Sequence, residues 1–311
     1  MILTVNKEGS LFSLMKRWWY PVRKLPDYHI RRIASACGHI ERTYHRKFGR
    51  KPEFSAPRTF NEKLGWIKRH FYDPVYTRMA DKVAVRDFVR ERAGEDLLVP
   101  CYGVWDRADD IPFAALPEAF VLKCNHESGF AIICREKSRL DIHLARAMLK
   151  TRLKMNYYYR FLEWPYRDIT PRIIAEELLR DGGGREPMEY KISCFNGEPR
   201  FILAEQFNRH RYLRCFYSPS WEQTPFTIRI PNTVDSLPRP VNLQRMLETA
   251  AALARDLLYC RVDLFSVDDR LYFNEMTIFP SAGLGPFLPE SYDLYWGEQL
   301  VLPHERKPAP L

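Results

Sequence analysis

Two carboxylates near the end of the chain have the type and spacing of a metal site. Asp263 and Glu275 lie in two short apolar segments, and residues 266–270 between them have the composition of a turn. This pattern predicts an antiparallel hairpin with both carboxylates on neighbouring strands. Because buried carboxylates are costly without a cation between them and Mg²⁺ prefers oxygen donors, the hairpin indicates a magnesium site. A structural alternative stays open, in which Asp263 pairs with Arg261 and Glu275 faces solvent.

Three lysines in separate segments have the character of anion-binding groups. Lys123 ends an apolar strand and leads into residues 125–130, a loop of mostly small and polar residues. An ammonium group beside a loop of backbone N–H groups suits a polyphosphate. Lys82 lies in a charged helical stretch, and Lys191 lies in an alternating, half-buried strand. Each lysine alone is also typical of a solvated position, so only the whole set indicates function.

The segments that carry these residues have alternating helical and strand patterns. Amphipathic spacing predicts helices over residues 27–50, from 59, from 73 to the residue before 94, over 140–154 and over 243–258. Thr59 and Glu62 form a capping box at the second helix. Strand patterns cover residues 97–104, 119–124, 131–134, 172–177, 189–195 and 200–206, with a type I′ turn at Asn196-Gly197. Helices followed by a small and then a larger mixed unit favour an α+β fold of two lobes.

The composition is that of an ordinary globular protein. The chain has 311 residues, of which 46% are hydrophobic and 28% are charged. It contains no run long enough to span a membrane, and the apolar residues 11–20 are interrupted by charges and lack a following cleavage site. Seven scattered cysteines include no C-x-x-C pair. These features predict a reduced, cytoplasmic setting.

The positive charge is concentrated in the N-terminal third. The net charge is +9, and residues 1–95 carry 21 Lys and Arg against 10 Asp and Glu. The basic, aromatic stretch 16–24 would suit an acidic polysaccharide or an anionic membrane surface; a solvated helical face is the alternative. No nucleic-acid reading motif accompanies the charge, so nucleic acid is disfavoured as a partner.

Taken together, the set resembles the ATP-grasp superfamily. The resemblance rests on the order of a helical lysine, a lysine before a flexible loop, an acidic strand end and a final Asp–Glu pair, at Lys82, Lys123, Glu176-Glu177, Asp263 and Glu275. Shorter phrases resemble its TupA-like branch, which acts in surface polysaccharide and teichuronopeptide biosynthesis. They span residues 45–298 and are Phe60-Asn61-Glu62-Lys63, Ala80-Asp81-Lys82, Tyr190-Lys191, Phe195-Asn196-Gly197, Arg261-Val262-Asp263-Leu264 and Glu275-Met276-Thr277.

The resemblance implies an ATP-grasp fold with a nucleotide between two lobes. It divides the chain into a basic helical region at 1–75, a small lobe at 76–160, a large lobe with the metal site at 161–298 and a tail at 299–311. The implied cofactors are ATP and Mg²⁺.

The same resemblance implies roles for individual residues. Lys82 and Lys123 would hold the α and β phosphates, while the loop with Ser128 and Gly129 would close over the triphosphate. Glu176 or Glu177 would meet the adenosine, Asp263 and Glu275 would bind Mg²⁺, and the catalytic groups would be Arg261 and Lys191. One position departs from the superfamily pattern. Many members have Asn two residues after the metal-binding Glu, and here Thr277 stands there.

The implied activity is ligation of a carboxylate to an amine through an acyl phosphate. A sugar acid in a cell-surface polysaccharide or its precursor, joined to an amino acid, is the predicted substrate pair. His126 and His210 are candidate general bases. A sugar kinase would use the same lysines and carboxylates, and a glycosyltransferase is the other alternative, although the chain contains no Asp-x-Asp. A non-catalytic polysaccharide- or membrane-binding protein would need the N-terminal charge but neither carboxylate. Cytoplasmic location at the inner membrane surface would fit an acidic acceptor.

Overall fold

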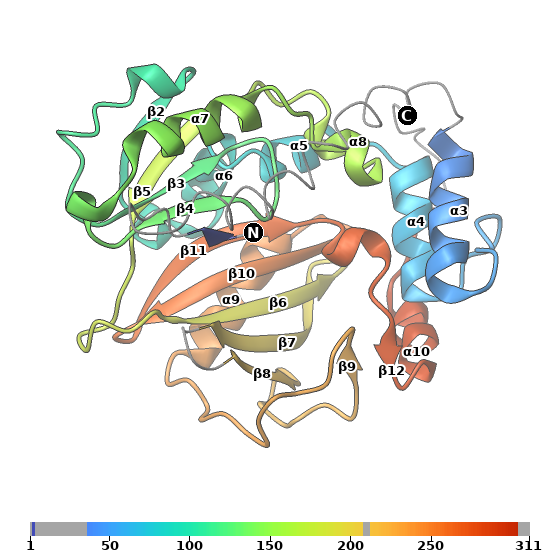
Figure 1. The fold of residues 1–311 in the computed structure, drawn as a ribbon. Helices are drawn as coiled ribbons and strands as arrows, with labels where there is room; N and C mark the ends of the chain where they lie inside the picture. The colour runs from blue at the N-terminus through green and yellow to red at the C-terminus, as the bar shows by residue number, and fades with distance from the viewer. Residues whose placement is uncertain (1, 4–35, 208–211, 304–311) are drawn as a thin grey trace.

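Two five-stranded sheets form the centre of the protein (Figure 1). The computed structural model describes residues 2–3, 36–207 and 212–303. The first sheet has the order β1-β4-β3-β5-β2, and the second has the order β11-β10-β6-β7-β8. Every pairing is antiparallel except that of β1 with β4. The strands are β1 Ile2–Leu3, β2 Cys101–Trp105, β3 Phe120–Cys124, β4 Ala131–Cys134, β5 Ile173–Glu177, β6 Met188–Phe195, β7 Glu198–Phe207, β8 Tyr212–Tyr217, β9 Thr227–Ile228, β10 Tyr259–Val267, β11 Arg270–Thr277 and β12 Phe287–Leu288.

Helices cover the outer faces of the two sheets. In Figure 1, α7 lies over the first sheet and α9 lies behind the second, while α3, α4 and α10 gather at one side. The helices are α3 Ala36–Phe48, α4 Phe60–His70, α5 Pro74–Ala80, α6 Ala84–Ala93, α7 Ile142–Leu153, α8 Tyr158–Phe161, α9 Leu243–Ala254 and α10 Ser291–Gln299. Short 3₁₀ turns occur at Glu95–Leu97, Ala108–Asp110, Lys137–Arg139, Trp164–Tyr166 and Pro280–Gly283. This arrangement is the predicted α+β fold. Within the described part of the chain, no helix has the length and apolar character needed to cross a bilayer.

The two faces of the second sheet differ in chemistry because successive side chains on a strand point to opposite faces. One face is apolar and packs on α9; Cys194 on this face donates its thiol hydrogen to the Ala250 carbonyl of that helix. The opposite face carries the polar and charged residues at alternate positions, namely Glu189, Lys191, Ser193, Glu205, Arg214, Arg261, Asp263 and Glu275. The sheet therefore presents one chemically active face toward the rest of the protein.

The two predicted hairpins are confirmed. β10 and β11 pair antiparallel, and Asp263 lies directly opposite Glu275. Asp268 and Asp269 form the turn with positive φ values of 46° and 63°, as the two central residues of a type I′ turn require. β6 and β7 likewise turn at Asn196-Gly197, where both residues have positive φ.

Helix α4 begins and packs as its sequence predicts. The Thr59 side chain accepts a hydrogen bond from the Glu62 backbone, and the Glu62 side chain accepts one from the Thr59 backbone. The helix then lies very close to α10, because a Cβ atom at Gly297 would come within 2.0 Å of the Arg58 carbonyl oxygen. Any larger residue at Gly297 would separate the two helices.

One helix was predicted from residue 73 to the residue before Gly94. This prediction is wrong in one respect, because two helices form there. α5 ends at Ala80 and α6 begins at Ala84. Asp81 causes the break, because its Oδ1 accepts hydrogen bonds from Val83 N and from Asn125 Nδ2, both at 2.8 Å. Lys82 therefore lies between two helices rather than inside one.

Other predicted boundaries also shift. The predicted helix over 27–50 is described only from Ala36, and the basic stretch 16–24 lies outside the described residues. The division into lobes stays a prediction. In the structure, α5 and α6 contribute to the larger hydrophobic core, and β5 lies between β3 and β2 in the first sheet.

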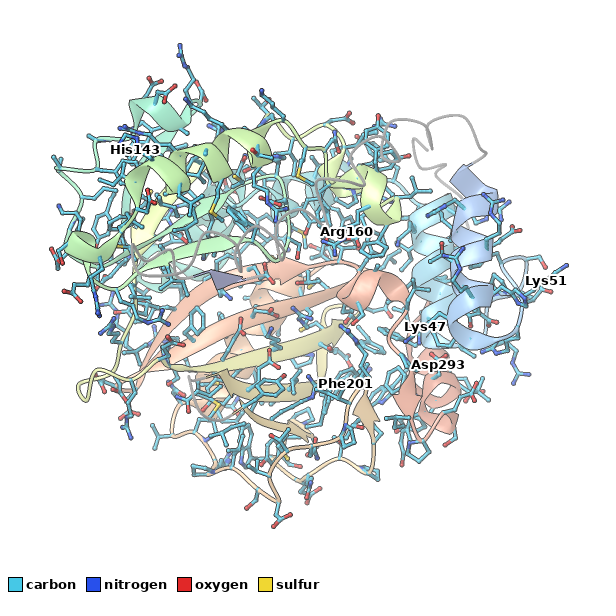
Figure 2. All side chains as sticks on the ribbon, in the orientation of Figure 1. Lys47, Lys51, His143, Arg160, Phe201 and Asp293 are labelled. Atoms are coloured by element: carbon cyan, nitrogen blue, oxygen red, sulfur yellow. The ribbon has the colours of Figure 1, made fainter. Side chains whose placement is uncertain are left out.

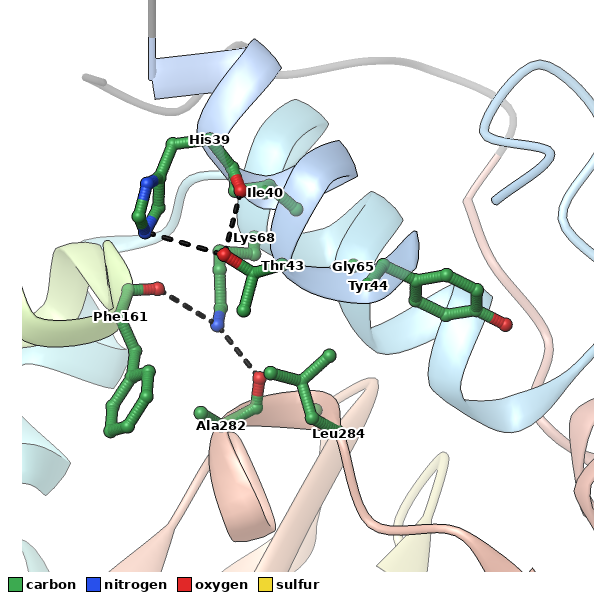
Figure 3. A pocket seen from close by; sticks show the side chains of 10 residues that line it. His39, Ile40, Thr43, Tyr44, Gly65, Lys68, Phe161, Ala282 and Leu284 are labelled. Carbon is green, nitrogen blue, oxygen red and sulfur yellow. Dashed lines mark hydrogen bonds between the residues drawn. The ribbon is translucent and has the colours of Figure 1, made fainter. Parts of the chain in front are cut away.

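A buried lysine joins three segments near α4 (Figure 3). Lys68 Nζ donates to the carbonyl oxygens of Phe161, at 3.1 Å, and Ala282, at 2.9 Å. Burial lowers the pKa of Lys68 to about 8, and burial raises the pKa of Glu163 to about 7 against the opposing effect of Lys68. Lys68 therefore connects α4 with the segments containing Phe161 and Ala282, and its charge favours the ionised form of the buried Glu163 carboxyl.

Replacing Lys68 by Met is expected to lower the free energy of unfolding by about 3 kcal/mol, because it leaves a buried carboxylate without its cation. The deficit should be larger at pH 8 than at pH 6. Glu163 is protonated in the folded state below its raised pKa and therefore needs no cation at pH 6. Urea unfolding at both pH values measures this, with Lys51→Met at an exposed position, labelled in Figure 2, as the control. A deficit below 1 kcal/mol, or one that is equal at both pH values, would contradict the pairing.

Candidate functional site

A cavity of about 380 Å³ lies between the two sheets. The first sheet and its loop contribute Lys123, Gly129 and Glu176, and the second sheet contributes Lys191 and Glu275. Lys82 and Glu177, which the sequence also predicted as site residues, line the cavity as well. The structure thus brings most of the predicted residues to one place.

Lys123 is held in its charged form at the first sheet. Its Nζ lies 2.9 Å from Glu176 Oε2, and Arg86 Nη1 lies 3.0 Å from Glu176 Oε1. Burial alone would lower the pKa of Lys123, but the nearby Glu176 carboxylate outweighs burial and the pKa is raised. Both oxygens of Glu176 are therefore used by cations in this structure. Its predicted role at the adenosine stays a prediction, as does that of Glu177.

Lys82 reaches the cavity from the connection between α5 and α6. Its Nζ donates to the carbonyl oxygen of Glu127, and its backbone N–H donates to Asn125 O at 3.2 Å. Asn125 is fully buried and also donates from Nδ2 to Asp81. These bonds tie Lys82 to the start of the loop that follows Lys123, so the two ammonium groups are positioned by one network.

The loop at residues 125–130 contributes through Gly129 and Phe130, which line the cavity. Gly129 has φ 80°, a left-handed conformation that glycine adopts without strain. Ser128 belongs to the same loop but is not among the residues that line the cavity. Its predicted contact with the triphosphate therefore stays a prediction.

Of the two histidines predicted as candidate bases, His126 does not line the cavity. His126 is buried, and its Nε2 lies 3.0 Å from Met155 O and 3.3 Å from Arg152 O. Burial lowers the pKa of His126. These contacts give His126 a structural position at the end of α7, whereas His210 lies outside the described residues.

Arg261 lies between the two predicted metal ligands. Its Nε and Nη2 donate to Asp263 Oδ1 and Oδ2 at 2.7 and 2.6 Å, and its Nη2 lies 3.7 Å from Glu275 Oε1. It also donates to Thr277 Oγ1 at 3.1 Å. Lys191 completes the cluster, with Nζ 3.9 Å from Asp263 Oδ2 and 2.7 Å from Glu205 Oε1.

Burial and charge act differently on the two carboxylates. Burial raises the pKa of Asp263 to about 7, even though Arg261 and Lys191 oppose the shift. Burial would also raise the pKa of Glu275, but the positive charges around it, Lys82 foremost, outweigh burial and lower it. Glu275 is therefore an ionised carboxylate at neutral pH, and it faces the cavity.

The donor set fits magnesium in the way that nucleotide enzymes hold it. Among the described residues, no group of three or more His, Cys, Asp or Glu side chains is arranged to bind a metal alone. Mg²⁺ usually takes one or two protein carboxylates and fills its other positions with water and substrate phosphates. Glu275 in the cavity wall would supply one carboxylate, and Asp263, directly opposite it, would supply a second only after giving up its two hydrogen bonds from Arg261. Their assignment as magnesium ligands stays a prediction.

Sequence reasoning gave no role to four residues that the structure adds to the site, namely Arg86, Glu189, Glu205 and Asn274. Arg86 binds Glu176 and also donates to Val99 O at 3.0 Å, while Asn274 donates to Glu189 Oε1 at 2.5 Å. Lys123 Nζ lies 3.4 Å from Asn274 Oδ1, so this asparagine connects the lysine on the first sheet to a carboxylate on the second. Glu205 is the closest carboxylate to Lys191. The alternation of Glu189 and Lys191 along one strand was the only local signal.

A sequence comparison decides which family has this arrangement. The profile described as TupA-like ATP-grasp matches residues 62–301. The chain belongs to the TupA-like ATP-grasp family. The match covers the cavity, the second sheet with the hairpin of Asp263 and Glu275, and every strand of the first sheet except β1. It confirms the resemblance inferred from the short phrases. Among curated proteins, no sequence relative was found.

Solved structures of the ATP-grasp fold resemble the chain at low identity. A D-alanine–D-alanine ligase from Bacillus anthracis, complexed with ATP, is 18% identical with a TM-score of 0.39, covering 64% of this chain and 55% of that one. An L-amino acid ligase from Bacillus licheniformis is 14% identical with a TM-score of 0.41, covering 67% and 44%. An N5-carboxyaminoimidazole synthetase from Staphylococcus aureus, complexed with ADP, is 12% identical with a TM-score of 0.41, covering 74% and 54%. The chain thus spans about half the length of each.

Proposed function

We propose that this TupA-like ATP-grasp protein is an ATP- and Mg²⁺-dependent ligase that joins an amine, such as that of an amino acid, to a carboxylate of a cell-surface polysaccharide or its precursor. The observation that carries the proposal is the cavity between the two sheets, which gathers Lys82, Lys123 and Glu275. Arg261 lies 3.7 Å from Glu275. Two ammonium groups, an ionised carboxylate and a guanidinium around one cavity match the needs of phosphoryl transfer from a triphosphate.

The proposed reaction has two steps. An oxygen of the acceptor carboxylate attacks the γ-phosphorus, the bond to the β–γ bridging oxygen breaks, and ADP leaves with the electron pair. The amine nitrogen then attacks the acyl carbon of the acyl phosphate, inorganic phosphate leaves, and the nitrogen loses a proton to solvent as the amide forms. The protein's contribution is positioning and charge neutralisation, because phosphoryl transfer needs little covalent help.

Each residue has a role that follows from its place. Lys82 and Lys123 hold the phosphates, since both ammonium groups line the cavity. Arg261 neutralises the charge that develops on the transferred phosphoryl group. Lys191 Nζ lies 3.1 Å from Glu189 Oε2 and 2.7 Å from Glu205 Oε1. Lys191 thus neutralises the carboxylates on this face of the sheet. Magnesium held at Glu275 and Asp263 would supply further charge neutralisation at the phosphates.

Analysis of the nucleotide products tests the proposal. The protein is incubated with Mg-ATP, digalacturonate as an acidic saccharide and a mixture of amino acids, and nucleotides are separated by anion exchange. We expect ADP and inorganic phosphate in equal amounts, with both acceptor and amine required. ADP without phosphate and without an amine requirement would indicate a kinase, whereas UDP released from a UDP-sugar would indicate a glycosyltransferase. AMP as the product would contradict both the ligase and the kinase.

The partners and the location belong to the same proposal. The stretch 16–24 is basic and aromatic, and charges of this kind attract an acidic saccharide or an anionic membrane surface. We therefore propose a cytoplasmic protein that associates peripherally with the inner membrane surface, where polysaccharide precursors would be met. Free, buried cysteines such as Cys194, Cys215 and Cys260 are compatible with a reducing compartment.

A further inference from the structure

A second cavity, of about 270 Å³, lies beside the nucleotide cavity on the same face of the second sheet. Both cavities are lined by Lys191, Glu205 and Tyr212, so these three residues mark the border between them. Arg261 lines the second cavity and approaches Glu275, which lines the first. A substrate in the second cavity would therefore reach the transferred phosphoryl group at the Arg261 end.

The wall of this cavity combines aromatic rings with guanidinium groups. Phe201 and Phe216 line it from β7 and β8, and Tyr259 lines it from β10. Figure 2 labels Phe201 on the second sheet, toward the part of the protein that carries α10. Aromatic faces suit the apolar C–H face of a sugar ring, and guanidinium groups suit carboxylates or phosphates. Together they favour an anionic saccharide over a purely apolar or a neutral ligand.

Arg214 is a buried cation with an unmet hydrogen-bond donor. Its Nη2 donates to Ile228 O at 2.8 Å and its Nη1 to Tyr212 Oη at 3.1 Å, and its guanidinium lies 5.0 Å from the centre of the Phe216 ring. Its Nε has no hydrogen-bond partner, although the side chain is only 10% exposed. A buried donor without a partner costs about 1–3 kcal/mol. Arg214 Nη1 also lies 3.5 Å from Glu205 Oε2, so Arg214 contributes a fixed, paired positive charge to the cavity wall.

Arg229 stands at the rim of the cavity in a strained backbone conformation. Its φ is 70°, and Ser281 and Ala282 have φ values of 52° and 60°. Left-handed conformations in residues other than glycine cost about 1–3 kcal/mol each and gather at ligand-binding sites. Arg229 Nη1 lies 3.4 Å from Ser281 Oγ, and no ion pair joins Arg229 to any residue that the structure describes. Its charge is thus available to a ligand.

The rim is held in this shape by a buried side chain of α4. Asn61 Nδ2 donates to Gly285 O at 3.0 Å, and Asn61 Oδ1 accepts from Gly285 N at 3.1 Å. Asp293 Oδ1 accepts from Asn61 Nδ2 at 2.9 Å. The segment that carries Ser281 is therefore clamped at Gly285, and the strained rim is preorganised before any ligand arrives.

We propose that this second cavity is the acceptor site, and that it selects a saccharide with an anionic group in addition to the carboxylate that reacts. The inference rests on the proposed ligase function. Arg261 is paired with Asp263 and, in the proposed function, serves the transferred phosphoryl group. Arg214 Nη1 lies 3.5 Å from Glu205 Oε2, whereas Arg229 has no ion pair with any described residue and remains for a second carboxylate or phosphate on the same acceptor. Arg229 is then a specificity-determining residue for the acceptor.

Binding measurements with saccharides that carry one or two anionic groups test whether the second group contributes to affinity. Titration calorimetry with Mg-ADP present compares galacturonate, digalacturonate and galacturonate 1-phosphate, with lactose as the uncharged control. We expect digalacturonate, or galacturonate 1-phosphate if the second group is a phosphate, to bind at least ten times more tightly than galacturonate. Arg229→Gln should remove that advantage, and Arg229→Lys should retain part of it. Arg255→Gln, at an exposed position that follows α9, is the matched control.

Two outcomes overturn the inference. One is that neither dianionic saccharide binds the unsubstituted protein more tightly than galacturonate does. The other is that Arg229→Gln binds them as the unsubstituted protein does. Failure of the proposed function appears elsewhere, as absence of ADP and phosphate production, because saccharide binding needs no turnover. Arg229→Gln should also keep the rise in melting temperature that Mg-ATP causes, and loss of that rise would assign Arg229 to the nucleotide instead.

Discussion

Asp263→Asn and Glu275→Gln are each expected to reduce turnover to less than a tenth of that of the unsubstituted protein. Both substitutions are nearly isosteric, and both remove a carboxylate charge that would hold Mg²⁺ on the phosphates. A tenfold loss corresponds to about 1.4 kcal/mol of transition-state stabilisation. ADP production at saturating Mg-ATP and acceptor measures the effect.

Asp269→Asn is the matched control for these two variants. Asp269 lies in the turn of the same hairpin, is exposed, and has φ 63°, a conformation that Asn tolerates. Its substitution should leave turnover unchanged. If Glu275→Gln retained more than a tenth of the activity while the protein stayed folded, the metal would lie elsewhere. If only Asp263→Asn retained activity, Asp263 would serve as the partner of Arg261 rather than as a ligand.

The features that local chemistry determines were predictable from the sequence. The turn at Asn196-Gly197 needs two positive φ values, and that dipeptide is suited to supply them. The Thr59 capping box uses only residues three positions apart. The short turn at Asp268-Asp269 sets the register of the two strands from Val267 and Arg270 to Leu264 and Phe273, and a β-bulge beyond Leu264 then brings Asp263 opposite Glu275. Each of these predictions depends on residues close together along the chain.

The features that the sequence did not predict depend on contacts between distant segments. Helix α5 ends at Ala80 because the Asn125 side chain donates a hydrogen bond to Asp81, and the sequence near residue 81 does not indicate that Asn125 is the partner. Arg86 pairs with Glu176, which is 90 residues away. Periodicity predicts the strand at 173–177 but does not determine which sheet takes it. The network around Lys123 could not be predicted, because its members come from both sheets.

The second cavity was also beyond prediction from sequence. Arg214 and Arg229 lie in segments that the sequence analysis did not assign, β8 and the residue after β9. Arg229 matters because of a positive φ, and Arg is not a residue type that indicates such a conformation. Its relation to Ser281 spans 52 positions. The proposed acceptor specificity therefore depends on the folded chain and has no local motif.

Lys123→Ala is expected to remove at least half of the rise in melting temperature that Mg-ATP causes. A ligand at 100 times its Kd stabilises a protein by about 2.7 kcal/mol. A charge-assisted hydrogen bond contributes about 1.5–3 kcal/mol to such binding, so its loss weakens the nucleotide complex by about tenfold or more. Scanning fluorimetry with and without Mg-ATP measures both the apo protein and the shift.

The apo Lys123→Ala protein should remain folded, because Glu176 keeps its ion pair with Arg86 at 3.0 Å. Lys150→Ala is the matched control: this lysine lies on α7, above the same sheet, is half exposed, and pairs with an exposed carboxylate, that of Asp109. It should leave the nucleotide-induced shift unchanged. An undiminished shift in Lys123→Ala would falsify the phosphate assignment. Lys82 would then be the cation to test next, since it lines the same cavity from the connection between α5 and α6.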